Sequence, residues 1–440
     1  MLSKTRCRPH REMSRITLKL RTLRLAYAVL GCALFITLPT EAKAGDLVSG
    51  HVKYQFNYLG FPQNSAFRDV LGSSAFDNNL EARIKFNFRR DKWDFKAAYQ
   101  FIGIYSDTLE LARNFPDSPL PVNSLINDDR RWWNLTYSFG DDQKNEFVHR
   151  LDRLSVGYAT DHTVWRFGRQ AISWGNGMVF SPMDIFNPFD PAAVDKEYKT
   201  GDDMLYGQYL FNNGNDLQGV AIVRRDPRTG DVESDQSSLA FKYHGFLGMN
   251  EFDLLAAQHF GDQVLGAGGI TNIGGAVWRG DLTWTHTDFD DVFSAATSLS
   301  YSWNWGGKNI SGLLEYYYNG FGQKNSAYAP ADLLENPALL ERIARGELFT
   351  LARHYIAASA TVEMHPLLML IPSFYINLED PSALAQLVVQ YDWKQNLHLL
   401  GAFNIPIGPD GSEYGGIEAP GDDRYFSNGP GLFIQLGWYF

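Results

Sequence analysis

The chain has 440 residues, of which 45% are hydrophobic and 20% charged, and its formal net charge is −11. This composition excludes disordered, collagen-like and coiled-coil chains and suits a folded protein with large apolar surfaces. The acidic balance also argues against a nucleic-acid partner, because like charges repel.

The first 44 residues differ from the rest of the chain. A basic head ends at Arg24, an apolar run spans 25–38, and a small-x-small site follows at 42–44. This order is typical of a secretory signal peptide, and we expect cleavage before Gly45. A retained membrane anchor and a lipoprotein site at Cys32 are the alternatives, although the apolar run is short for a spanning helix.

Loss of this segment changes what the remaining chain can do. Residues 45–440 carry 30 basic and 48 acidic residues, a net charge of −18, and no cysteine, because Cys7 and Cys32 both lie in the leader. A disulfide or thiolate site is therefore excluded. No later run approaches the 18 apolar residues of a spanning helix. We expect an exported protein that is not a helical membrane protein.

Short segments of alternating apolar and polar residues make up most of the remaining chain. In VSGHVKYQFNY, which begins at Val48, apolar side chains share one face, and His51, Lys53 and Gln55 share the other. Such alternation predicts half-buried strands, and sequences such as NNGN and NWGGKN predict the turns between them. We predict nineteen strand segments: 48–58, 79–89, 93–101, 131–139, 152–160, 163–170, 203–211, 216–224, 237–244, 251–260, 263–270, 275–286, 291–303, 309–318, 352–363, 367–378, 384–392, 397–405 and 430–440.

Large aromatic residues gather near the ends of these segments, as at Trp93, Trp278, Trp284, Tyr301, Trp303 and Trp438. Aromatic girdles of this kind flank the apolar band of a sheet that crosses a bilayer. About ten residues suffice for a tilted strand to cross. Lipid offers no partner for an unpaired strand edge, so the sheet must close. The sequence predicts an all-β fold, a transmembrane antiparallel β-barrel.

The leader, the alternating strands, the long polar loops, the missing cysteines and the terminal Phe440 together resemble Gram-negative outer-membrane β-barrels of the porin-like kind. The resemblance covers 45–440 as one domain and is weak for substrate. It implies a location in the cell outer membrane. It also implies that the barrel-assembly machinery reads the final strand, with Leu436, Trp438 and Phe440 as the signal.

Bacterial barrels have even strand numbers, so nineteen segments include an error. We expect 18 strands, with 16 or 20 as alternatives, and place the error before residue 150, where 106–114 is a candidate hidden strand. Counting back from a periplasmic C-terminus sorts the links by length. Long links fall outside at 171–202, 226–236, 319–351 and 406–427, and short ones in the periplasm at 212–215, 304–308, 364–366 and 393–396.

Residues 165–209, which include the loop 171–202, are the least strand-like stretch, because they combine glycines and prolines with large aromatic residues. We expect this loop to fold into the lumen and constrict it; a packed surface loop is the alternative. Acid on one side and base on the other would create a transverse field, unless the charges simply pair with each other. The candidates are Arg166, Asp184, Asp190, Asp195, Glu197, Asp202 and Asp203 at the loop, and Lys53, Arg83, Lys85, Arg89 and Lys96 on the opposite face.

A second loop, 325–349, contains a predicted helix. Asn336 is the expected cap, Pro337 occupies the first turn, and Gly346 ends the helix. Leu333, Leu340 and Ile343 are expected to line one side of it. A lid over the mouth, a plug and an external decoration are the alternatives.

The sequence favours a passive channel for small hydrophilic solutes, constricted by 171–202. The alternative is a gated, substrate-specific transporter for uptake of a sugar or organic acid, or for export. An aromatic sugar slide would use Trp132, Tyr317, Tyr375 and Tyr439, which fall on predicted inward faces.

We expect no enzyme, because GxSxG, HExxH and phosphate-loop motifs are absent; a lipid-modifying barrel is the weakest alternative. The histidines are scattered, so we expect no metal or other cofactor. Expected partners are outer-membrane lipid, the assembly machinery and solutes, and homo-oligomerisation remains open.

Overall fold

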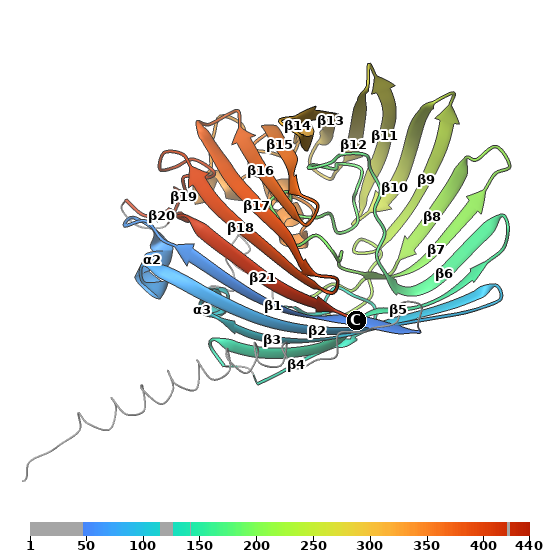
Figure 1. Ribbon diagram of the computed structural model, residues 1–440, viewed down its shortest axis with the longest axis horizontal. Coiled ribbons are helices and arrows are strands. Elements are labelled where there is room, and N and C mark those ends of the chain that lie inside the picture. Colours follow the sequence, from blue (N-terminus) through green and yellow to red (C-terminus); the bar gives the residue numbers. More distant parts are fainter. Residues whose placement is uncertain (1–46, 115–125, 141, 420–422) are drawn as a thin grey trace, which may run out of the picture. The chain divides into compact units, whose positions relative to one another are not determined.

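The computed structural model describes residues 47–114, 126–140, 142–419 and 423–440 (Figure 1). The predicted signal peptide, residues 1–44, lies outside these ranges and stays a prediction. Residues Leu47–Tyr439 form one compact unit, and all helices and strands of the described chain belong to it.

One antiparallel sheet contains the strands β1 (Val48–Gly60), β2 (Ser74–Arg90), β3 (Trp93–Ser106), β4 (Thr136–Phe139), β5 (Asn145–Ala159), β6 (Thr163–Gln170), β7 (Asp202–Leu210), β8 (Asp216–Ile222), β9 (Ser238–Leu247), β10 (Asn250–His259), β11 (Asp262–Ile273), β12 (Ala276–His286), β13 (Asp291–Trp305), β14 (Lys308–Tyr318), β15 (His354–His365), β16 (Leu368–Asn377), β17 (Ser382–Lys394), β18 (Leu397–Ile407) and β21 (Gly431–Tyr439). A separate hairpin joins β19 (Ile417–Glu418) and β20 (Tyr425–Phe426). The helices are α2 (Ala66–Leu71), α3 (Asp107–Asn114), α4 (Pro330–Leu334) and α5 (Pro337–Arg345). None of the helices in the described part of the chain is long and apolar enough to cross a membrane.

The sheet closes into a ring because β1 pairs with β2 on one edge and with β21 on the other. Tyr54 illustrates this closure, since it faces Leu80 of β2 and Leu436 of β21. Nineteen strands share the sheet, and all except β4 belong to the closed ring, which therefore has 18 strands. The expected even number is confirmed.

The surplus segment in the sequence prediction is 131–139, of which only β4 is a strand. β4 pairs with residues 147–150 of β5, alongside the part of β5 that β6 does not reach. The expected hidden strand at 106–114 is wrong, because this stretch forms α3. The Ser106 hydroxyl accepts a hydrogen bond from the Leu109 N–H at 2.9 Å and so caps the helix.

The two ends of the barrel differ in the length of their links. At the end where β1 begins, here called the turn end, links contain two to five residues, as at 91–92, 160–162, 211–215, 248–249, 274–275, 306–307, 366–367 and 395–396. The opposite, loop end carries the long links, including 61–73, 107–144, 171–201, 223–237, 319–353 and 408–430. The predicted sorting of long and short links to opposite ends is confirmed; 260–261, 287–290 and 378–381 are short exceptions at the loop end.

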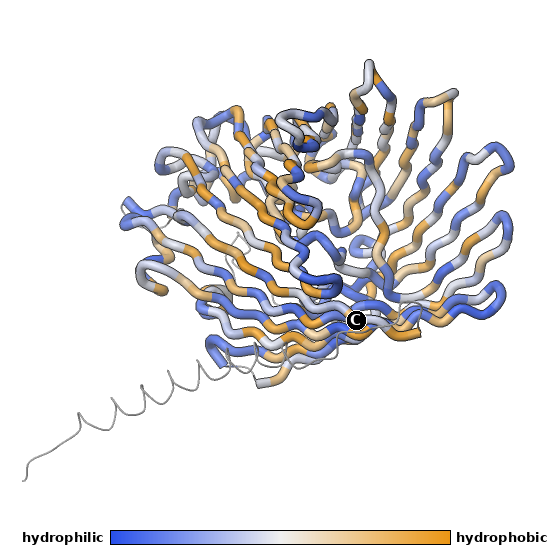
Figure 2. Tube along the Cα trace, in the orientation of Figure 1, coloured by the Kyte–Doolittle hydropathy of each residue, from blue (hydrophilic) through white to orange (hydrophobic). Residues whose placement is uncertain are grey.

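Side chains alternate across the wall, as the sequence pattern requires. Leu254, Leu265 and Leu282 point away from the lumen and are 51%, 52% and 49% exposed, whereas the adjacent Asp253 and Asp281 face inward and are buried. Figure 2 shows the same alternation of hydrophobic and hydrophilic positions along the strands. An apolar surface that continues around a ring is far larger than a water-facing patch and is suited to contact lipid.

We predict that Leu282→Arg, in the middle of β12, destabilises the barrel in phospholipid vesicles by about 2–4 kcal/mol, because it places a charge in the hydrocarbon. The matched variant Leu247→Arg lies beside a turn, and we expect it to cost at most about 1 kcal/mol. Urea unfolding followed by tryptophan fluorescence measures both values. Equal costs at the two depths would contradict a lipid-facing outer wall.

Candidate functional site: a loop across the barrel lumen

The link between β6 and β7, residues 171–201, crosses the lumen and contacts the inner wall on several sides. Its Asn176 and Gly177 N–H groups donate to Asp281 of β12 at 2.7 and 3.2 Å. Further along, the Pro191 carbonyl accepts from Tyr375 of β16 at 3.0 Å. The Ala192 carbonyl then accepts from Gln386 of β17 at 2.8 Å. In Figure 1 the green-teal segment between β6 and β7 runs across the interior. The predicted inward fold is confirmed.

A buried carboxylate fixes the middle of this crossing. Glu315 of β14 is 1% exposed and accepts from the backbone N–H groups of Met178, Val179 and Phe180, the closest at 2.6 Å. These N–H groups lie outside the strands, so no neighbouring strand supplies an acceptor. Because they are buried, they need another acceptor. The inward-facing Glu315 on the wall is that acceptor. Its position therefore fixes where residues 178–180 of the loop lie.

Apolar side chains hold the same loop against the wall. Trp174, Met183 and Phe186 are almost completely buried in a cluster with Val220 of β8 and Leu255 of β10. Further along, Phe180 stacks on Tyr317, with ring centroids 4.6 Å apart. The aromatic residues that made this loop unusual in the sequence therefore pack inside the barrel.

The far end of the loop carries two acids that meet a base of the opposite wall. Lys53 of β1 lies 2.7 Å from Asp195 and 2.7 Å from Glu197, and its side chain is 2% exposed. Burial raises the pKa of Glu197, but hydrogen bonds from Lys53, Tyr198 and Tyr439 outweigh it and bring this pKa down to about 2. Glu197 is therefore ionised at neutral pH.

Three arginines beside this contact share one carboxylate. Arg83 of β2 pairs with Asp152 of β5, whose carboxylate also lies 3.0 Å from Arg153 and 3.7 Å from Arg150. The Tyr198 ring lies 3.9 Å from the Arg83 guanidinium carbon and holds it in place. A cavity of about 170 Å³ separates loop and wall here, lined by Lys53, Gln55, Glu81, Arg83, Gln100, Arg150, Asp152, Asp195, Tyr198, Lys199 and Thr200.

Sequence reasoning missed Arg150, Asp152, Arg153 and Tyr198. For the three residues of β5 the reason is a β-bulge, where the pairing with β3 shifts register between Ala98 and Tyr99. The shift lets Asp152 and Arg153 contact the same cluster although they are neighbours in sequence. The stretch HRLDRLS carried a signal, because its two leucines are spaced by three residues and interrupt the alternation.

The other predicted acids do not join this cluster. Asp184 pairs with Lys199 of the same loop at 2.5 Å, and burial raises its pKa. Asp202 pairs with Arg224 at 2.7 Å. Asp203 pairs with Arg169 at 2.8 Å. Asp190 is exposed and accepts from the Ala192 N–H at 2.8 Å.

Of the predicted bases, Lys53 and Arg83 line the cavity, and Lys85 reaches the Tyr198 hydroxyl at 3.1 Å. Arg89 and Lys96 are exposed and lie outside its lining. Arg166 lies 3.7 Å from Asp94 on its own part of the wall.

The structure does not form a continuous aromatic slide. Trp132 stacks on Trp133 and packs edge-on against Phe167, an exposed residue of the outer face, so its predicted inward position is wrong. Tyr317 and Tyr375 do face inward, but loop 171–201 covers them, and they are 4% and 7% exposed.

The second predicted loop element is confirmed as a helix. The Asn336 side chain accepts from the Leu339 N–H, Pro337 begins α5, and Gly346 ends it with a left-handed conformation. Leu333 and Ile343 are buried as expected, whereas Leu340 is only partly buried.

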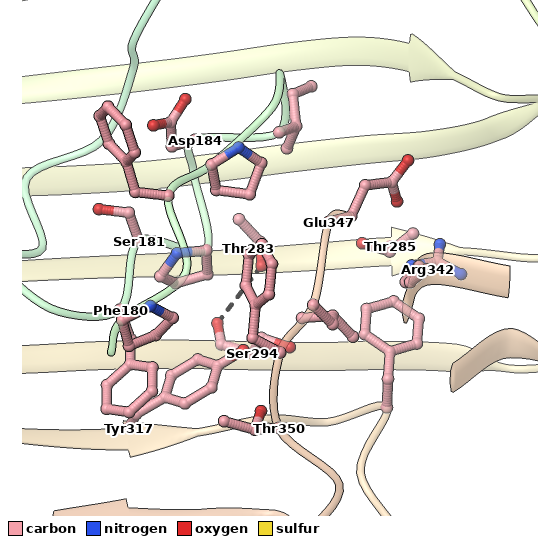
Figure 3. Close-up of a pocket in the computed structure, with 18 of the residues that line it drawn as sticks. Phe180, Ser181, Asp184, Thr283, Thr285, Ser294, Tyr317, Arg342, Glu347 and Thr350 are labelled. Carbon is pink, nitrogen blue, oxygen red and sulfur yellow. Dashed lines mark hydrogen bonds between the residues drawn. The ribbon is translucent and has the colours of Figure 1, made fainter. Parts of the chain in front are cut away.

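Link 319–353 approaches loop 171–201 inside the loop end. A pocket of about 90 Å³ lies between them. In Figure 3, Phe180 and Asp184 lie on one side of this pocket and Arg342 and Glu347 on the other. Across the mouth, Arg342 of α5 lies 2.5 Å from Asp262 of β11. The link therefore covers part of the loop end and is not an outward decoration.

Neither a protein-family model nor a curated protein matches the sequence. Solved structures match over almost the whole barrel. A BenF-like porin from Pseudomonas fluorescens Pf-5 has 9% identity and a TM-score of 0.50, with 90% of this chain and 98% of that chain covered. The chain has a porin-like fold. OccAB2 of Acinetobacter baumannii aligns at 9% identity with a TM-score of 0.48, covering 91% of this chain and 99% of that chain.

The porin-like fold agrees with the sequence resemblance to porin-like β-barrels. Within the described ranges, no three His, Cys, Asp or Glu side chains are grouped so that they could hold a metal ion.

We predict that Lys53 and Glu197 are coupled by about 1–3 kcal/mol, less than a fully buried pair because Glu197 is 33% exposed. A double-mutant cycle of Lys53→Met and Glu197→Gln, measured by urea unfolding in vesicles, gives this value. Because the pKa of Glu197 is lowered from 4.5 to about 2, the coupling is complete above pH 4.5 and disappears as the pH falls towards 2.

The control cycle pairs Glu197→Gln with Arg89→Met, which removes an exposed base of β2 outside the cavity. We expect these two changes to add within about 0.5 kcal/mol. If the Lys53 cycle is equally additive, the far end of the loop is not held by this contact.

Proposed function

We propose that the protein is an outer-membrane channel for passive diffusion of small hydrophilic solutes, and that loop 171–201 is its constriction. The observation that carries this proposal is the loop itself, which is hydrogen-bonded to inner-wall residues from β1 to β17 and borders a charged cavity. The porin-like fold supports it. With the turn end in the periplasm and the loop end outside, the link lengths follow those of bacterial barrels.

The cavity carries opposite charges on its two sides. On the wall, Arg83, Arg150 and Arg153 surround the carboxylate of Asp152, and Glu81 is a second wall acid that lines the cavity, so three bases face two acids. On the loop, Asp195 and Glu197 share the single ammonium of Lys53. Each group keeps an excess of one sign, which supports the predicted transverse field. A field between low-dielectric walls orients passing dipoles and slows ions whose charge is wrongly placed.

A gated, substrate-specific transporter is the second candidate. The observation that favours it is the apolar cluster at the loop end, in which α5 and its flanking residues pack against Phe180 of the crossing loop. Saturable block of the current by one solute would favour this candidate over simple diffusion. Neither candidate involves a chemical step, and we propose no catalytic residue.

The closing strand supports a role in assembly. In β21, Leu436 and Trp438 alternate with Gln435 and Gly437, so they share a face with the exposed Leu432 and Ile434. We propose that this outward face, together with Phe440, is what the barrel-assembly machinery recognises. Lipid and small solutes are the other proposed partners.

We predict opposite shifts in ion preference when the two sides of the cavity are neutralised. Asp195→Asn with Glu197→Gln should move the reversal potential in a salt gradient towards anions. Arg150→Gln with Arg153→Gln should move it towards cations, because each change removes one end of the field. Single-channel recording in a planar bilayer measures both shifts. The control Arg228→Gln removes an 86% exposed charge from link 223–237 and should change nothing.

Identical reversal potentials in all variants would place the constriction elsewhere. Absence of any discrete conductance from the folded barrel would overturn the open-channel proposal itself and favour the gated transporter.

A further inference from the structure

Three separate parts of the chain pack together in one apolar cluster at the loop end, here called the cap. Phe180 comes from the crossing loop, and Ile417 comes from link 408–430. Link 319–353 contributes Phe321, Tyr328, Leu333, Leu339, Ile343, Leu351 and Ala352. Tyr317, Tyr355 and Tyr375 of the wall complete the cluster. Link 408–430 thus contributes Ile417 to the cap, and its Tyr414 and Phe426 pack against the cap.

One carboxylate joins link 408–430 both to link 319–353 and to the neighbouring wall strands β15 and β16. Glu413, in link 408–430, accepts from the Leu351 N–H at 2.8 Å. It also accepts from the Tyr355 hydroxyl at 2.5 Å and from the Asn377 side chain at 2.8 Å. Its own N–H donates to Asp380, in the link between β16 and β17, at 2.9 Å. A single side chain thus joins three chain segments.

Among the described residues, the groups that act on Glu413 do not include a cation. Asp380 is a second carboxylate and is 7% exposed, and Tyr328, Tyr355 and Tyr414 are the other titratable groups around it. Within the described residues, neither Glu413 nor Asp380 forms an ion pair at salt-bridge distance. An ionised Glu413 is therefore held by hydrogen bonds alone, beside a like charge and inside packed protein, where a charge is costly.

We propose that Glu413 is a proton-operated latch, which holds link 408–430 against link 319–353 when it is protonated and releases it when it is ionised. Protonated Glu413 retains the contacts with Leu351 and Asn377 and meets in Tyr355 a hydroxyl that can donate or accept. Ionised Glu413 gains full hydration only when link 408–430 leaves the cap. That this release opens the pore rests on the channel function proposed above.

The direction of the pH effect follows from linkage. Burial, with a smaller contribution from the Asp380 charge, raises the pKa of Glu413 from 4.5 to about 7, against the three hydrogen bonds that lower it. The docked links therefore bind the proton more tightly than the released ones. Docking is strongest below pH 4.5 and weakens as the pH rises to about 7. Each pH unit within this window changes the docking equilibrium by up to tenfold, so the whole window changes it on the order of a hundredfold.

The latch can be tested by measuring the distance between the two links directly. The chain from residue 45 onwards has no cysteine, so spin labels can be attached through Ala344→Cys on α5 and Asp410→Cys in link 408–430, both at exposed positions. Electron-spin distance distributions are recorded in vesicles at pH 5 and pH 8.5. We expect one short, narrow distance at pH 5 and a broader, longer distribution at pH 8.5.

Two variants separate the latch from general effects of pH. Glu413→Gln keeps the shape of the protonated side chain, and we expect the short distance at both pH values. Glu418→Gln removes an exposed carboxylate from the same link and should behave like the parent. A distance that does not depend on pH in the parent, or that still responds in Glu413→Gln, would overturn the latch.

Conductance recorded on the same samples separates the two proposals. With the latch and the channel both correct, current falls at pH 5 in the parent, and Glu413→Gln stays low at both pH values. Links that separate with pH in a barrel that never conducts would overturn the channel function and leave the latch. A conducting barrel with a fixed distance would overturn the latch alone.

Discussion

The pairing of β1 with β21 is the constraint on which the rest of the structure depends. A sheet that faces lipid cannot leave an edge unpaired, and here the first and last strands supply each other's hydrogen bonds over nine residue pairs. Closure places every second side chain in an enclosed lumen. Only in that enclosure do the inward-facing acids, bases and tyrosines find partners, and loop 171–201 provides many of them.

The loop and the lumen stabilise each other through complementary polar groups. Buried carboxylates such as Glu315 and Asp281 would be costly if they were left without donors. Buried N–H groups of the loop would also raise the free energy of the folded state if they had no acceptors. Joining the two satisfies both and fixes the path of residues 176–180. Glycine is required on this path, since Gly175 has φ 100° and a Cβ on Gly177 would lie 1.8 Å from the Phe180 carbonyl oxygen.

The sequence predicts the barrel well because alternation and turn composition are local properties. The even strand number, the inward loop and Asn336 as the N-terminal capping residue of helix α5 are all confirmed. The site was predicted less well, because the choice of partner is not local. Asp184 and Asp195 are similar acids in one loop, yet one pairs with Lys199 of the same loop and the other with Lys53 of the far wall. The β5 bulge further hid the arginine cluster, because it interrupts the alternation of apolar and polar residues from which strands are predicted.

The central claim is that solutes pass between loop 171–201 and the wall of β1 to β5, and one measurement tests it directly. Thr200 lines the cavity and is exposed within it, so Thr200→Cys can be modified by a charged thiol reagent during single-channel recording. The account predicts a stepwise loss of current on modification, and no loss for Thr229→Cys, which is exposed in link 223–237. Full current after complete modification of Thr200→Cys would show that the conducting path runs elsewhere.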